Sequence, residues 1–179
     1  MTIRSPKDLA KHALAGVSLG YAEAFVALAR AHIPEEAGAA AYGAICGYYA
    51  RPFTNNHGFG GLSPRFVPSD AMSVHEQVMR DRHKVFMHSE KDVEIDGTFV
   101  NTLEFVSDGK CITVHNIFVC PTAQWLDQVE NLIGRVRSAL NEAVLSCLNE
   151  GPASKASTPA GTYSLNLKGD HPWFISRPT

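Results

Sequence analysis

The chain has 179 residues, of which 45% are hydrophobic and 19% are charged, and its formal net charge is -2. This composition is typical of a globular protein and argues against general disorder, and the length fits one domain. The small net charge excludes a global attraction to nucleic acid or anionic lipid, so any RNA contact must be local. Residues 1–10 lack the charged-then-apolar order of a signal peptide, and no apolar run of about eighteen residues occurs. We therefore expect a cytoplasmic protein with no membrane contact.

The four cysteines are spread along the chain on apolar segments. They are Cys46, Cys111, Cys120 and Cys147, and no CxxC pair occurs. This distribution indicates buried free thiols rather than a disulfide framework or a zinc site. We expect neither a metal ion nor a cofactor.

Two helices are predicted in the first fifty residues. Residues 6–33 should form a long helix with Ser5 as N-cap, and residues 34–50 should form a second helix, joined to the first by a short turn. The stripe expected to be buried on the first helix is Leu14, Val17, Tyr21, Phe25 and Leu28. Small residues follow the same spacing on both helices: Gly16, Gly20 and Ala24 on the first, and Ala39, Gly43 and Gly47 on the second. We expect close packing between these two rows.

A third helix follows a loop rich in Gly, Pro and Asn, which apolar side chains should hold against the body of the protein. Ser69 or Asp70 should cap this helix, which should end near Met87 or His88. Reading its apolar stripe at intervals of three and four places Arg82 in the middle of the buried face. A cation in such a position needs either a partner or a function, because a buried unpaired charge is costly.

Over residues 92–118 the spacing of apolar residues changes from that of a helix to that of a strand. Asp96-Gly97 and Asp108-Gly109 are strong hairpin signals, so we predict a three-stranded antiparallel meander. If Asp108-Gly109 forms a two-residue turn, Phe105 faces Ile112 on an apolar face that should pack on the helices.

Residues 122–149 form the best amphipathic helix of the chain, with an apolar stripe suited to core packing or to a dimer. The fold class is therefore α+β, mainly α: residues 1–150 form a four-helix bundle with the inserted meander. Residues 151–179 form a partly flexible C-terminal tail, which could add a strand to the edge of the meander.

Two segments resemble a known family. The segments are RDRHKVFMHSEKD, after the third predicted helix begins, and YYARPFTNN, at residues 48–56. They resemble the HEPN superfamily (higher eukaryotes and prokaryotes nucleotide-binding domain), in particular uncharacterised bacterial members. That family carries an arginine, a polar residue, three to five further residues and a histidine, which here fall on Arg82, His83 and His88. A polar Asn or Asp commonly occupies the position of His83.

The resemblance implies metal-independent RNA cleavage by a toxin or defence protein, with Arg82 and His88 as catalytic residues. The histidine would move protons at the ribose 2′-OH or the leaving oxygen, and the arginine would stabilise charge on the phosphoryl oxygens. Two copies could form a homodimer and share one cleft. The residues predicted to line it or to hold the RNA are Tyr49, Arg51, Asn55, Asn56, His75, Arg80, His83 and Lys84. A cognate partner protein is also implied.

Structural explanations remain open beside these roles. Arg82 could form a salt bridge with Glu76, with Asp81 or with an acidic residue on another helix, and His88 could interact with the helix dipole. His75 is favoured as a hydrogen-bonded core histidine, and Tyr42 and Tyr49 are most simply core aromatics with their hydroxyls at the edge. The alternative functions are a non-catalytic module that binds a nucleotide or a protein, and a small-ligand binding protein that uses the loop at residues 49–56.

Overall fold

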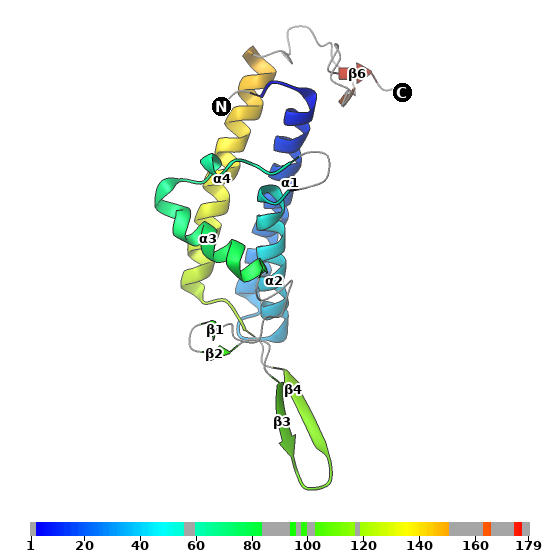
Figure 1. Ribbon diagram of the computed structural model, residues 1–179, viewed down its shortest axis with the longest axis vertical. Coiled ribbons are helices and arrows are strands. Elements are labelled where there is room, and N and C mark those ends of the chain that lie inside the picture. The colour runs from blue at the N-terminus through cyan, green and yellow to red at the C-terminus, as the bar shows by residue number, and fades with distance from the viewer. Residues whose placement is uncertain are drawn as a thin grey trace.

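The computed structural model describes residues 3–55, 60–83, 94–95, 98–99, 103–116, 119–150, 163–165 and 174–176. Within these residues the protein is mainly helical, with four α-helices and two-stranded antiparallel sheets (Figure 1). The α+β, mainly α, class predicted from the sequence is therefore confirmed. The helices are α1 (Pro6–Ala31), α2 (Glu36–Ala50), α3 (Met72–Asp81) and α4 (Ala123–Glu150).

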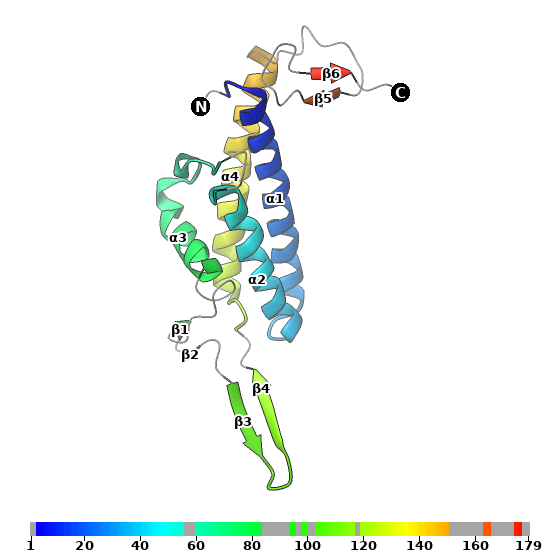
Figure 2. The same ribbon diagram turned by 45° about the vertical axis from the view of Figure 1, so that its right-hand side comes forward.

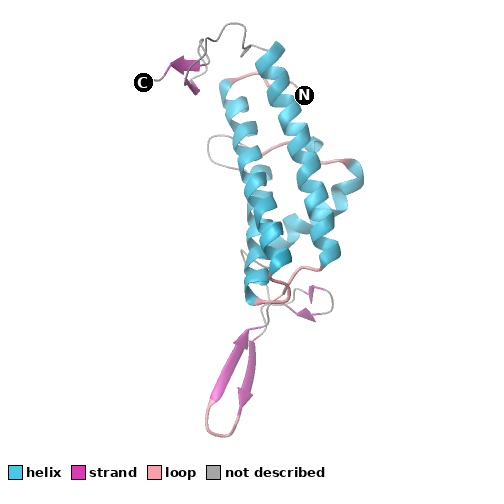
Figure 3. Cartoon of the chain, turned by 180° about the vertical axis from the view of Figure 1, so that it is seen from behind, coloured by secondary structure: helices cyan, strands magenta, loops and turns pink. Residues whose placement is uncertain are grey.

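The hydrophobic core lies between the helices. The long helices α1 and α4 lie side by side, α2 packs along α1, and α3 contacts α2 and α4 (Figure 3). The predicted apolar face of α4 is confirmed, because its central residues are almost fully buried: Leu126, Val129, Ile133, Val136 and Leu140. The loop before α3 is also packed as expected, with Leu62, Phe66 and Val67 buried.

One predicted helix start is confirmed and another is not. The Ser5 side chain accepts a hydrogen bond from the backbone N–H of Asp8 at 3.1 Å, which caps α1. A short 3-10 helix (Ser69–Ala71) precedes α3, and no side chain caps α3. The carboxylate of Asp70 instead accepts two hydrogen bonds from the Arg135 guanidinium on α4, at 2.8 and 2.9 Å. Asp70 lies within the 3-10 helix, and Ala71 occupies the N-cap position of α3.

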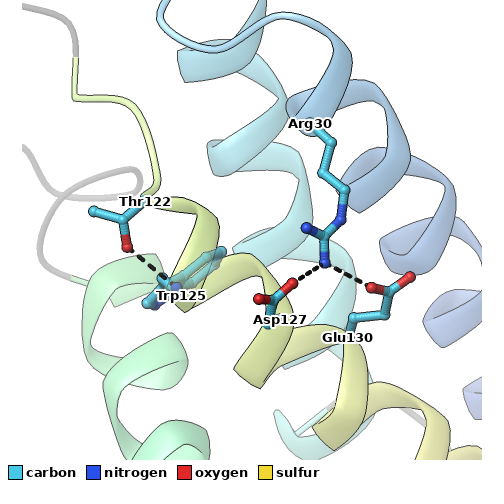
Figure 4. Close-up of polar contacts among 5 residues, drawn as sticks. All are labelled: Arg30, Thr122, Trp125, Asp127 and Glu130. Carbon is cyan, nitrogen blue, oxygen red and sulfur yellow. Dashed lines mark hydrogen bonds and ion pairs between the residues drawn. The ribbon is translucent and has the colours of Figure 1, made fainter.

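Polar contacts also join α1 to α4 (Figure 4). The Arg30 guanidinium near the end of α1 donates to Asp127 at 2.6 Å and to Glu130 at 2.7 Å, both near the start of α4. The Thr122 hydroxyl accepts a hydrogen bond from the backbone N–H of Trp125 at 3.1 Å. This bond satisfies a backbone donor in the first turn of α4.

The prediction of the buried face of α1 was wrong at four of its five positions, and only Phe25 packs partly buried against the core. Leu14, Val17 and Tyr21 are each more than half exposed, and Leu28 is 42% exposed. The buried residues include Ala15, Ala22 and Ala29, together with Leu9, Leu19 and Val26. Both sides of α1 carry apolar residues, so the periodicity alone does not choose between them. The side with alanines every seven residues allows α2 and α4 to approach more closely.

The expected close contact at the glycines is not observed. A Cβ atom added at Gly16 or Gly47 would meet no atom within 4 Å, and one at Gly20 would meet only the end of the Arg137 side chain at 4.0 Å. The tight approach occurs at the turn between α1 and α2. There a Cβ atom on Gly38 would lie 2.6 Å from the carbonyl oxygen of His32.

Two separate hairpins lie between α3 and α4. Strands β1 (Glu94–Ile95) and β2 (Thr98–Phe99) pair with each other, as do β3 (Leu103–Ser107) and β4 (Ile112–Asn116). Among the described residues, no pairing joins β2 to β3, which a three-stranded meander would require. The C-terminal strands β5 (Tyr163–Leu165) and β6 (Phe174–Ser176) also pair with each other, not with a meander edge.

The predicted register of the β3–β4 hairpin was wrong by two residues. Phe105 lies opposite Val114 rather than Ile112, because the turn contains four residues instead of two. The Asp108 carboxylate accepts hydrogen bonds from the backbone N–H groups of Lys110 and Cys111, each at 2.8 Å. These bonds stabilise the longer turn, as Asp side chains often do. A shift of two residues leaves each side chain on its predicted face.

The β3–β4 hairpin does not pack on the helices. Phe105 is 66% exposed and Ile112 is 68% exposed. Figure 2 shows the hairpin extending past the ends of the helices. The expectation that its apolar face covers the core was therefore wrong.

Helix α1 is long and apolar enough to cross a membrane by length and composition alone. Of its most apolar window, 39% is buried inside the protein. A core helix of a soluble protein passes the same test, so this finding is weak evidence for a membrane span.

Candidate functional site

The candidate site comprises the facing sides of α2 and α3 and the end of α3. Tyr42, Cys46 and Tyr49 are spaced four and three residues apart on α2, so they share one face. His75 and Asp81 are the buried polar residues of α3, six residues apart. The two helices run in opposite directions here, because Tyr49 contacts His75 while Tyr42 contacts Asp81.

The first polar pair is buried. The Tyr49 hydroxyl oxygen and His75 Nδ1 share a hydrogen bond at 2.8 Å, and the Phe53 ring lies edge-on to the imidazole at 4.7 Å. Burial lowers the pKa of His75, and the nearby Glu76 charge offsets part of this shift. Burial raises the pKa of the Tyr49 hydroxyl. Both side chains are therefore neutral at pH 7, and this pair matches the core role that the sequence favoured for His75.

The second pair contains a buried carboxylate. Tyr42 donates its hydroxyl proton to Asp81 at 2.8 Å, and Asp81 is only 2% exposed. Arg80 Nε lies 3.5 Å from the same carboxylate. The pKa of the Cys46 thiol is raised well above its ordinary value, first by burial and then by the charge of Asp81. Cys46 is therefore an unreactive thiol in this environment.

Arg82 does not occupy the buried face of α3. The buried residues of that helix are His75, Val78 and Asp81, so the buried charge is the carboxylate next to Arg82. Arg82 is half-buried, and its backbone N–H bonds to the carbonyls of Met79 and Val78. The sequence placed Arg82 in the stripe because it follows Val78 by four residues. The observed buried residues, His75, Val78 and Asp81, are instead three residues apart.

The Arg82 side chain forms no hydrogen bond or ion pair with any residue in the described part of the chain. Neither expected partner takes that role, since Asp81 binds Tyr42 and contacts Arg80, and Glu76 forms no ion pair with Arg82. The backbone widens into a π-helical turn at Arg82 and His83. Such turns occur frequently at functional sites.

The other predicted site residues fall into two regions. Arg80 and His83 are exposed beside Arg82, at the C-terminal end of α3, where the helix dipole favours cations. Arg51 and Asn55 are exposed after the end of α2, close to the start of α3. From His75 to Arg82 the helix rises by about 10 Å, so Arg51 and Asn55 lie at the opposite end of α3. His88, Asn56 and Lys84 lie outside the described residues.

The interaction that sequence reasoning missed is the Tyr42–Asp81 pair. Asp81 was considered only as a partner of Arg82, and Tyr42 only as a core aromatic. The available signal was spacing, because Tyr42 and Tyr49 are seven residues apart and must point the same way. The described residues contain no group of three or more His, Cys, Asp or Glu side chains that could hold a metal ion.

The chemistry of this site is thus concentrated at the end of α3. The Tyr49–His75 and Tyr42–Asp81 pairs are hydrogen-bonded and buried, so they expose little surface to a ligand. Arg80 and Arg82 instead place two permanent positive charges near the end of α3, with Arg80 exposed and Arg82 half-buried, and a guanidinium suits a phosphate. Comparisons with models of protein families, with curated proteins and with solved structures found no match for this chain.

Proposed function

We propose that this protein is a HEPN-like endoribonuclease that works without a metal ion, with Arg82 and His88 as its catalytic residues. The observation that supports the proposal is that Arg82 is not fully buried and forms no ion pair within the described residues. A structural arginine is expected to be buried against a carboxylate, but Arg82 is only half-buried and has no such partner among the described residues. Its guanidinium is therefore available to a phosphate.

The contacts of Asp81 support this availability. Its carboxylate accepts the Tyr42 hydroxyl proton and contacts Arg80, and it forms no ion pair with Arg82 within the described residues. In the proposed reaction, Arg82 stabilises charge on the phosphoryl oxygens through its planar fork of donors. Arg80 and His83 lie beside it and hold the RNA backbone.

His88 supplies the proton transfers in this proposal. A histidine exchanges protons near neutral pH, so it can take the proton of the ribose 2′-OH or protonate the leaving oxygen. This role rests on the sequence resemblance, because His88 lies outside the described residues. The fold included in the proposal is a HEPN-type bundle of α1 to α4, and the biological setting is a toxin or defence system.

The test is cleavage of a mixed RNA pool by the purified protein in EDTA. The wild type should produce ends with 2′,3′-cyclic phosphate, and His88→Ala should abolish the products. Arg82→Ala should lower the rate by about two to three orders of magnitude, the usual effect of removing one transition-state donor. Arg82→Lys should recover only part of the rate, because a lysine keeps the charge but loses the fork.

Two further variants act as controls. Arg80→Ala should mainly weaken RNA binding and reduce its dependence on salt, with less effect on the rate at saturating RNA. Asn141→Ala, at an exposed position on α4, should behave like the wild type. Absence of cleavage by a well-folded wild type would reject the enzyme. Retained RNA or nucleotide binding in that case would support the non-catalytic binding module.

A further inference from the structure

Helix α1 carries a stripe of large apolar side chains on its outer side. Leu14, Val17 and Tyr21 are 55%, 57% and 54% exposed, and Leu28 is 42% exposed. Their spacing of three, four and seven residues keeps them in one line along the helix. Exposed apolar patches of this kind mark interaction surfaces, because their contact with water is unfavourable.

No charge interrupts this stripe. Between Lys11 and Arg30 the only charged residue of α1 is Glu23, and its carboxylate pairs with Arg137 on α4. The neighbouring exposed residues on the outer side include Ala13 and Ala24, whose small side chains allow another helix to come close. The surface therefore fits a helix with a matching apolar stripe.

The charges considered at the two ends of the stripe have opposite signs, because Arg30 in the last turn of α1 is already paired with Asp127 and Glu130 on α4. Lys7 is exposed one heptad before Leu14, and so lies in line with the stripe at its N-terminal end. Glu35 and Glu36 are exposed just past the other end of α1. A second copy of α1 that runs in the opposite direction would bring each lysine close to the glutamates of its partner. A parallel copy would bring like charges together.

We propose that α1 is the interface of a homodimer, in which two α1 helices pack antiparallel about a two-fold axis near Tyr21. In this arrangement Leu14 of each copy packs against Leu28 of the other, and the two Tyr21 rings meet at the centre. The same patch is used on both copies, so the assembly closes as a dimer.

This interface does not depend on the proposed RNA cleavage. Helix α3 contacts α2 and α4, and Figures 1 and 2 show it on the side away from α1. A dimer through α1 therefore keeps the two Arg82 side chains on separate outer surfaces. Each protomer has its own site, in contrast to the shared cleft expected from the sequence.

Sedimentation equilibrium tests the dimer directly. The wild type should be dimeric, and Tyr21→Glu should weaken self-association by at least about 30-fold, as expected for a central aromatic anchor. Leu145→Glu is the matched control, because Leu145 is 50% exposed on α4, outside the stripe. This variant should associate like the wild type. Circular dichroism checks that each variant keeps its helices.

Two experiments test the antiparallel direction. Lys7→Glu should weaken the dimer, and adding Glu35→Lys should restore it. For cross-linking, Cys111 and Cys120 are first replaced by serine. Tyr21→Cys should then form a disulfide with its own copy, whereas Leu14→Cys should form one only with Leu28→Cys.

Four outcomes would overturn the proposal. They are a monomeric wild type, a dimer that Tyr21→Glu does not weaken, self-cross-linking of Leu14→Cys as efficient as that of Tyr21→Cys, and binding to phosphatidylcholine vesicles in place of self-association. The last outcome would identify a lipid surface as the partner of the stripe. None of these measurements involves RNA, so this proposal and the proposed function can fail separately.

Discussion

The Tyr49 hydroxyl oxygen lies 2.8 Å from Nδ1 of His75, and both side chains are buried between α2 and α3. The imidazole thus uses one nitrogen to hold two helices together. Its ring packs nearly perpendicular to the Phe53 ring, with 4.7 Å between the ring centroids, and only 8% of His75 is exposed to solvent. These contacts give His75 a structural role that can be measured through the dependence of stability on pH.

The free energy of unfolding should fall as the pH drops below neutral. Burial lowers the pKa of His75 in the folded protein, so the unfolded chain binds more protons at pH values between the folded pKa and about 6.5. The contribution is complete above the unfolded pKa and is lost as the pH falls through this window. Burial lowers the pKa of His12 in the same direction.

Urea unfolding between about pH 7.5 and about pH 5.5 measures this effect. His75→Gln should show a smaller decrease than the wild type. An equal decrease in both proteins would mean that His75 does not titrate differently on unfolding.

Arg82→Ala should change the free energy of unfolding by less than about 0.5 kcal/mol, as for an ordinary surface substitution. The reason is that Arg82 forms no ion pair within the described residues. Tyr42→Phe is the contrasting variant and should cost about 1.5–3 kcal/mol, because it removes a hydrogen bond to the buried carboxylate of Asp81. Urea titration compares the two. A loss of about 3 kcal/mol or more in Arg82→Ala would indicate a structural ion pair.

Alanine at two glycines should have opposite effects. Gly16→Ala should stabilise the protein by about 0.5–1 kcal/mol, since Gly16 is inside α1 and an added Cβ would meet no atom within 4 Å. Gly38→Ala should destabilise it, because its Cβ would lie 2.6 Å from the His32 carbonyl oxygen. Thermal unfolding of both variants tests the pair. Equal effects would contradict the observed packing at the turn.

The β3–β4 hairpin should contribute little to the stability of the helices. Phe105→Ser and Ile112→Ser should each change the free energy of unfolding by less than about 0.5 kcal/mol, because both side chains are mostly exposed. Ile133→Ala in the core of α4 should cost about 2–5 kcal/mol. Chemical denaturation followed by the helical signal makes this comparison. A large loss in either hairpin variant would show that the apolar face is covered after all.

The sequence predicts an element best when the element has a single apolar face. The stripe of α4 is of this kind, and Val129, Ile133 and Val136 are buried as expected. Helix α1 is apolar on two sides, so its period predicts a helix without showing which side faces the core. The register of β3 and β4 depends on the length of the turn, which the hydrogen bonds of the Asp108 side chain determine. The Asp-Gly pair alone does not contain that information.

The candidate site is predictable in part for a similar reason. The burial of His75 and Tyr49 follows from their helical positions, and it agrees with the core role favoured for both rather than with a place in the RNA cleft. Whether Asp81 or Arg82 faces inward depends on a rotation of α3 of about 100°, the angle of one residue. The pairing of Asp81 with Tyr42 decides that rotation, and it requires knowledge of how α3 lies on α2.

The Tyr42–Asp81 and Tyr49–His75 pairs also fix the position of α3 along α2, and with it the position of the chain that follows α3. This helix has ten residues, and apart from Val78 its buried positions are His75 and Asp81. Apolar contacts alone would tolerate sliding, but a displacement of one turn would leave the Tyr42 and Tyr49 hydroxyls opposite the wrong partners. Such a displacement would move Arg82 by about 5.4 Å along the helix axis. Two tyrosines on α2 therefore determine how far along its axis the arginine-bearing end of α3 extends.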